Sequence, residues 1–223
     1  MKVNHEQTKN KILDICRVLR DQANYAKAFR QESKKVLDDE MLAQKYKNDK
    51  LAQLREAYNA KYNETKDKVV KMLGEIAEIE LEQEKILELD VPEFSNTLAT
   101  INAAQGKLPA DVIEGIKLNF AGQYQALLAI KAAFERYEVD LKHYGYEEYV
   151  TSVAFAIKPL ENAAANIEQD EVSTVLSIKR LFDDVLKFGK IRGITFTPDQ
   201  ETFGEFDEEE ENLLARRAMG LID

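Results

Sequence analysis

The stretch LAQLREAYNAKYNETKDKVVKMLGEIAEIELEQEKI, residues 51–86, decides the fold of this chain. Its apolar residues recur in alternating steps of three and four positions, an average spacing of about 3.5 residues. This spacing continues over about five heptads, which is typical of a coiled-coil seam. Polar residues interrupt the seam at Arg55, Thr65 and Gln83. We expect the association seam to consist of Leu51, Tyr58, Tyr62, Val69, Met72, Ile76, Ile79 and Ile86.

An earlier apolar series has the same spacing but a different phase. It runs from Ile12 to Val36, and its continuation does not reach Leu51. The break lies in DDEMLAQKYKND, residues 38–49. Two structures fit it: one helix of roughly 80 residues that passes through a stutter, or two antiparallel helices that turn near 47–49. The equal lengths of the two series favour the hairpin, whereas the lack of a glycine at the turn argues against it.

The whole chain favours helix. The first glycine is Gly74, the first proline is Pro92, and Ala, Leu, Glu, Lys and Gln are abundant. We expect an all-α fold with a long N-terminal helical hairpin or coiled-coil arm, followed by a small helical bundle. The best strand candidate is IRGITFT, residues 191–197, so at most a minor β-hairpin is expected there. The expected organisation is an arm over 1–90, a bundle over 91–190, and a connector with an acidic tail over 191–223.

The net charge of −10 is unevenly distributed. Residues 1–74 hold 17 basic and 11 acidic side chains, whereas residues 199–223 hold two and nine. A basic arm and an acidic tail can attract each other, within one molecule or between copies, over a screening length of about 8 Å. No apolar run approaches the roughly 20 residues of a membrane span, and MKVNHEQTKNK lacks the apolar core of a signal peptide. With one cysteine, the sequence predicts a cytoplasmic protein without membrane contact.

Few residues suggest catalytic or metal chemistry. Asp140 and His143 lie one helical turn apart, but di-iron bundles use such a pair twice, and we interpret His143 as a surface histidine. Cys16 has no histidine at a catalytic spacing, so we expect a buried or half-buried structural thiol. Phosphate-binding glycine loops and the nucleophile elbow are missing from the sequence. We therefore expect no catalytic residue, metal, cofactor or small-molecule substrate.

One basic cluster is a candidate nucleic-acid-binding site. Lys27, Arg30, Lys34 and Lys35 lie close together in sequence, as phosphate contacts require. Interspersed acidic residues dilute this patch, and Phe29 belongs to the apolar stripe. The sequence thus argues against nucleic-acid binding and favours a solvated helix face.

The chain closes with FGEFDEEEENLLARRAMGLID, residues 203–223. The acidic run 207–211 suits the start of a short helix, because the positive end of the helix dipole lies there. An isolated helix of about 13 residues is marginal in water, so we expect it to form on its own body or on a partner protein. The apolar residues expected to bind are Phe206, Leu213, Leu214, Ala218 and Leu221.

These features favour a non-enzymatic protein that acts through protein–protein interaction or assembly, by self-association or by holding a partner protein. The layout is similar to that of assembly factors such as the scaffolding proteins of tailed bacteriophages, in its long helices, acidic balance and short terminal docking helix. An alternative is an acidic inhibitor that mimics nucleic acid and occupies a basic groove on a partner protein. Direct nucleic-acid binding by the arm is a further alternative.

Overall fold

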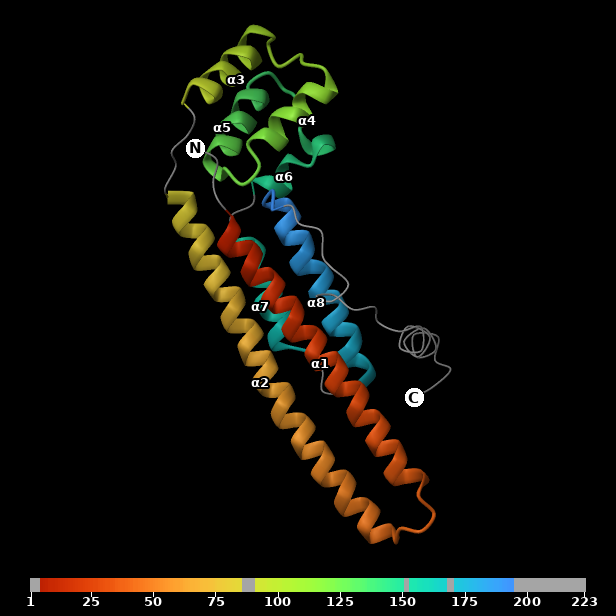
Figure 1. Ribbon diagram of the computed structural model, residues 1–223. Coiled ribbons are helices and arrows are strands. Elements are labelled where there is room, and N and C mark those ends of the chain that lie inside the picture. The colour runs from red at the N-terminus through yellow and green to blue at the C-terminus, as the bar shows by residue number, and fades with distance from the viewer. Residues whose placement is uncertain (1–4, 86–90, 151–152, 168–170, 195–223) are drawn as a thin grey trace. The chain divides into compact units, whose positions relative to one another are not determined.

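The computed structural model describes residues 5–85, 91–150, 153–167 and 171–194, and the fold of these residues is all-α, as the sequence predicts (Figure 1). The contacts group them into two compact units. One unit contains 5–11, 74–159 and 186–194, and the other contains 12–73 and 160–185, with the gaps already stated. The helices are α1 (Glu6–Asp38), α2 (Gln44–Lys85), α3 (Val91–Ala103), α4 (Ala110–Asn119), α5 (Tyr124–Glu135), the 3₁₀ turn η1 (Lys142–Tyr144), α6 (Tyr146–Tyr149), α7 (Val153–Ala165) and α8 (Glu171–Ile191). The boundaries expected near 90 and 190 therefore differ from those of the two units.

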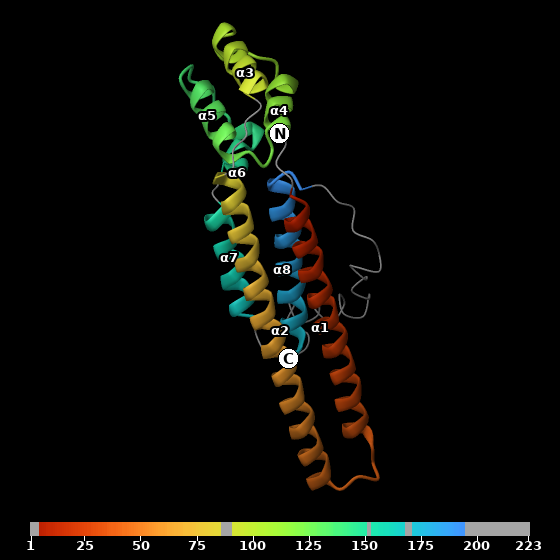
Figure 2. The ribbon, with the colours of Figure 1, turned by 60° about the vertical axis from the view of Figure 1, so that its left-hand side comes forward.

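The unit with residues 12–73 is built on the hairpin alternative. Figures 1 and 2 show α1 and α2 side by side, with the chain reversing between them. Tyr58 of α2 stacks on Phe29 of α1 with ring centroids 4.6 Å apart, and it also stacks with Tyr25 of α1 at 6.1 Å. The Thr65 hydroxyl donates to Gln22 Oε1 at 3.0 Å. This hydrogen bond joins the two helices at one of the polar positions of the seam.

The turn lies earlier than the sequence suggested. Helix α1 ends at Asp38 and α2 begins at Gln44, so the predicted turn at 47–49 is wrong and those residues belong to α2. The Asp39 carboxylate accepts a hydrogen bond from the Met41 backbone N–H at 2.9 Å, which lets a turn form without glycine. Lys47 Nζ then donates to the Leu37 carbonyl at 2.7 Å and satisfies one of the last acceptors of α1.

The predicted seam residues pack inside the chain. Tyr58, Tyr62, Val69, Met72 and Ile76 are buried, whereas Leu51 and Ile79 are half-buried. The Tyr62 hydroxyl donates to the Ile167 carbonyl, so the segment after α7 also covers the hairpin. Ile86 lies outside the described residues. These contacts use the seam for intramolecular packing, and the buried residues Val175, Ile178, Leu181 and Val185 of α8 add to the core.

The other unit has a core of its own. Phe134 of α5 meets Tyr146 of α6 edge to face at 6.3 Å, and Phe94 of α3 meets Phe120 in the same way at 6.1 Å. Buried aliphatic residues from α3, α4 and α5 fill the space between them, among them Ile101, Ile113, Leu127 and Ile130.

The predicted strand over 191–197 is wrong for its described part. Helix α8 continues to Ile191, and Arg192 and Gly193 form a turn in which Gly193 has a φ of 72°. The Arg192 N–H still donates to the Phe188 carbonyl at 3.1 Å, which is a helical pattern. Residues 195–197 lie outside the described part. The described helices include none that is long and apolar enough to cross a membrane.

The same leucine-to-alanine change at two positions of α1, one buried and one exposed, tests the packing of the hairpin. Leu19→Ala removes a buried side chain, and we expect it to lower the free energy of unfolding by about 2–5 kcal/mol, because a cavity remains. Leu37→Ala removes an exposed side chain and is expected to change it by less than about 0.5 kcal/mol. Urea unfolding followed by circular dichroism measures both values. Equal effects would contradict the antiparallel packing of α1 on α2.

Candidate functional site

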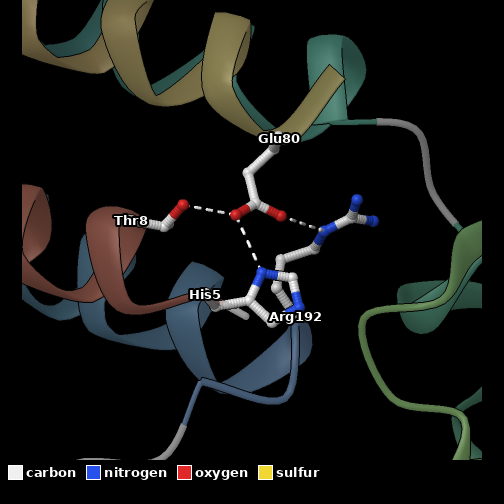
Figure 3. Close-up of polar contacts among 4 residues, drawn as sticks. All are labelled: His5, Thr8, Glu80 and Arg192. Atoms are coloured by element: carbon white, nitrogen blue, oxygen red, sulfur yellow. Dashed lines mark hydrogen bonds and ion pairs between the residues drawn. The ribbon is translucent and has the colours of Figure 1, made fainter. Parts of the chain in front are cut away.

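The most concentrated polar chemistry in the described residues surrounds Glu80 of α2 (Figure 3). The Glu80 side chain is only 1% exposed, and an isolated buried carboxylate is strongly destabilising. His5 Nδ1 donates to Glu80 Oε1 at 2.9 Å, and the Thr8 hydroxyl donates to the same oxygen. Arg192 Nε lies 3.7 Å from Oε2. The start of α1, the end of α2 and the end of α8 therefore meet at one carboxylate, all within one unit.

The surroundings of Glu80 favour its charged form. Burial acts to raise the pKa of the carboxyl group, but the hydrogen bond and charge of His5, the Thr8 hydrogen bond and the Arg192 charge outweigh it. The pKa of Glu80 is therefore lowered from its ordinary value. The carboxylate stays ionised at neutral pH and acts as the acceptor for its neighbours.

The other side of the His5 ring packs against Gly122, in the loop between α4 and α5. Gly122 has a φ of 79°, and a Cβ there would lie 2.2 Å from His5 Nε2 and 2.9 Å from the Arg192 carbonyl oxygen. His5 Nε2 is buried without a hydrogen-bond partner. A His–Glu pair can act as a general base, but here the reactive nitrogen faces a glycine backbone and leaves no space for a substrate. The arrangement is suited to holding three chain segments together.

One signal in the sequence could have revealed this cluster. The predicted seam passes from Ile76 to Ile79, but in the structure Leu73, Ile76 and Glu80 are the buried residues, and Ile79 is half-buried. Glu80 lies four residues after Ile76, so it continues the same helix face with an acidic residue. An acid on a buried face requires a partner, but the sequence alone does not indicate that the partners are His5 and Arg192.

A second polar cluster holds the turn around η1. Lys117 of α4 is buried, donates to the Tyr144 carbonyl at 2.6 Å and lies 2.7 Å from Glu114. Its ammonium also lies 5.0 Å from the centre of the Tyr149 ring. Burial and the nearby Glu114 charge raise the pKa of Tyr146 above its ordinary value. This cluster fixes the backbone between α5 and α6.

The other residues singled out by the sequence are buried, exposed or outside the described part. Cys16 is fully buried, which confirms the expected burial, and burial raises the pKa of its thiol to about 12. His143 and Asp140 are exposed, with Nε2 and Oδ2 4.0 Å apart. Among the described residues, no group of three or more His, Cys, Asp or Glu could hold a metal ion. The predicted tail residues Phe206, Leu213, Leu214, Ala218 and Leu221 lie outside the described part.

Large apolar side chains are exposed where α1 ends and α2 begins. Leu37 is 55% exposed, Met41 93% and Tyr46 55%. We name residues 34–50 the hairpin end. The Asp39–Met41 and Lys47–Leu37 hydrogen bonds give it a defined backbone, so these side chains belong to an ordered surface.

Comparison of the chain with protein-family models, curated protein sequences and solved structures finds no match.

The Glu80 cluster makes a prediction about pH. A lowered folded-state pKa means that ionised Glu80 stabilises the fold above its ordinary pKa of about 4.3, and that this stabilisation is lost as the pH falls through the folded-state pKa. We expect Glu80→Gln to lower the free energy of unfolding by about 2 kcal/mol near pH 7 and by progressively less below about pH 4. Urea unfolding across this pH range measures the difference.

Glu78→Gln is the matched control, because Glu78 is an exposed acid on the same helix. It should change stability little at any pH. A Glu80→Gln effect that does not depend on pH, or that equals the effect of Glu78→Gln, would contradict the proposed role of the carboxylate charge.

Proposed function

We propose that this protein is a non-enzymatic assembly protein, and that it associates with a second copy of itself through the hairpin end. The observation that carries the proposal is the exposure of Leu37 at the end of α1, Met41 in the turn and Tyr46 at the start of α2. Isolated exposed apolar residues are common on soluble proteins, but a gathering of large ones at the end of a helical hairpin is typical of an interaction surface.

The charges around the apolar residues support a second copy as the partner. The hairpin end contains five lysines and four acidic residues. In a two-fold symmetric contact the same surface meets itself, so each charge can face the opposite sign on the other copy. The chain as a whole carries a charge of −10, which makes two copies repel each other, and a local surface of mixed sign reduces this repulsion.

The predicted alternative, an acidic mimic of nucleic acid, depends on the run 207–211, which lies outside the described residues. It remains a prediction. The hairpin end has both signs of charge and does not resemble the single-sign surface that such a mimic requires.

Light scattering after size exclusion tests the proposal. A contact made by the few exposed side chains of the hairpin end is expected to be weak, with a dissociation constant between about 10 μM and 1 mM. The mass should rise from the 25.5 kDa of one chain towards twice that value across this concentration range. The double variant Met41→Glu with Tyr46→Glu should remain at 25.5 kDa, because it buries like charges in the contact.

Leu128→Glu is the control, since Leu128 is also an exposed apolar residue but belongs to α5. It should associate as the unmodified chain does. Circular dichroism checks that every variant is folded. A chain that stays at 25.5 kDa at every concentration, or a double variant that still associates, would overturn the proposal.

A further inference from the structure

Met41 has the largest exposed fraction of the large apolar side chains in the described part of the chain. It is 93% exposed, whereas Leu37 and Tyr46 of the same hairpin end are each 55% exposed. The Met41 thioether therefore lies in solvent in the free chain. In the self-association proposed for the hairpin end, this side chain passes from water into an apolar contact, and it has a larger fraction of its surface to bury than Leu37 or Tyr46.

The other sulfur atoms of the described residues are shielded from solvent. Met72 of α2 belongs to the buried part of the seam, and Cys16 of α1 is fully buried. Burial also raises the pKa of the Cys16 thiol to about 12, so its reactive thiolate form is scarce at neutral pH. Among the described residues, Met41 therefore carries the sulfur that a dissolved oxidant reaches most readily.

The backbone around Met41 is held independently of its side chain. The Met41 N–H donates to the Asp39 carboxylate at 2.9 Å, and the Leu42 N–H donates to the Asp39 carbonyl at 3.4 Å. Lys47 Nζ donates to the Leu37 carbonyl at 2.7 Å and joins the two ends of the turn. These hydrogen bonds do not involve the Met41 thioether. A chemical change at the sulfur is therefore expected to leave the hairpin folded and to alter only its surface.

We propose that Met41 is a reversible oxidation site that controls association through the hairpin end. The inference rests on the proposed function, because it assigns a regulator to the same surface. The oxidant is hydrogen peroxide, which converts the thioether to methionine sulfoxide. A sulfur lone pair forms the S–O bond, the O–O bond of the peroxide breaks, and the other oxygen leaves as water. The sulfur loses the two electrons that the peroxide gains.

The sulfoxide opposes the contact between two copies. A thioether is apolar and polarisable, whereas the sulfoxide oxygen is a hydrogen-bond acceptor that must lose its water when it enters an apolar contact. In a two-fold contact both copies contribute the same residue, so this cost arises twice in each dimer. We expect oxidation of Met41 to raise the dissociation constant at least about tenfold.

The modification is reversible. A methionine sulfoxide reductase transfers two electrons and two protons from a pair of thiols to the sulfoxide, which returns to the thioether as one water is released and the thiols form a disulfide. Reduction of Met41 should therefore restore association. Oxidation and reduction at one exposed sulfur would set the amount of associated protein without unfolding the chain.

Light scattering of the full chain before and after treatment with dilute hydrogen peroxide tests the inference. Peptide mass spectrometry follows the added oxygen, which should appear on Met41 at least about tenfold faster than on Met72. At full conversion of Met41, the dissociation constant should have risen at least about tenfold. Circular dichroism and the urea midpoint should stay unchanged. Methionine sulfoxide reductases for both sulfur epimers, with dithiothreitol as the reductant, should restore the original dissociation constant.

Three variants separate Met41 from the other methionines. Met41→Leu keeps an apolar side chain without sulfur, so it should associate as the unmodified chain does and should not respond to peroxide. It retains Met1 and Met219, so a response caused by their sulfurs would persist in it. Met41→Gln introduces a polar oxygen and should weaken association without peroxide. Met72→Leu is the matched control for a buried sulfur and should respond to peroxide as the unmodified chain does.

Two results would overturn the inference while the proposed function stands. One is an unmodified chain that carries the Met41 sulfoxide and associates as tightly as before. The other is a Met41→Leu chain that loses association under peroxide to the same extent as the unmodified chain. Failure of the proposed function has a different signature, because the untreated chain then stays at 25.5 kDa at every concentration. That result would overturn both the contact and its control by oxidation.

Discussion

A buried carboxylate must be surrounded by hydrogen-bond donors and positive charge, and Glu80 imposes this requirement on one unit of the protein. His5 and Thr8 from the start of α1 and Arg192 from the end of α8 meet it together. The same requirement explains Gly122, because the His5 ring and the Arg192 carbonyl occupy the space that a side chain would need. Residues far apart in sequence are thus fixed around one charge, which also positions the point where the chain leaves α8 beside α4.

The other unit depends on apolar and aromatic packing. Tyr58 stacks with Tyr25 and Phe29, and the Tyr62 hydroxyl donates to the Ile167 carbonyl, so these seam residues of α2 have partners inside the chain. The polar interruption at Thr65 is matched by Gln22 of α1. A polar pair of this kind favours one register between two helices, because a shifted register leaves the buried Gln22 oxygen without this donor.

The buried residues of the seam are not accessible to other molecules, so interactions with other molecules must use exposed residues. Among the described residues, Leu37, Met41 and Tyr46 of the hairpin end are large apolar side chains that remain exposed. The hairpin end combines these apolar residues with five lysines and four acidic residues. We propose self-association through this surface.

The sequence by itself determined the all-α class, the apolar stripe of each hairpin helix and the break between them, because these follow from the helical period and the scarcity of glycine and proline. It also indicated a buried Cys16. The tertiary structure decided that the seam pairs within the chain and that the turn forms at Asp39. The Asp39 carboxylate accepts a hydrogen bond from the Met41 N–H and stabilises a turn that contains no glycine. It also decided the Glu80 cluster and the end of α8 at Ile191 in place of a strand. The Glu80 cluster joins residues far apart in the chain, such as Glu80 and Arg192, which are 112 positions apart, and local periodicity contains no information about such distant pairs.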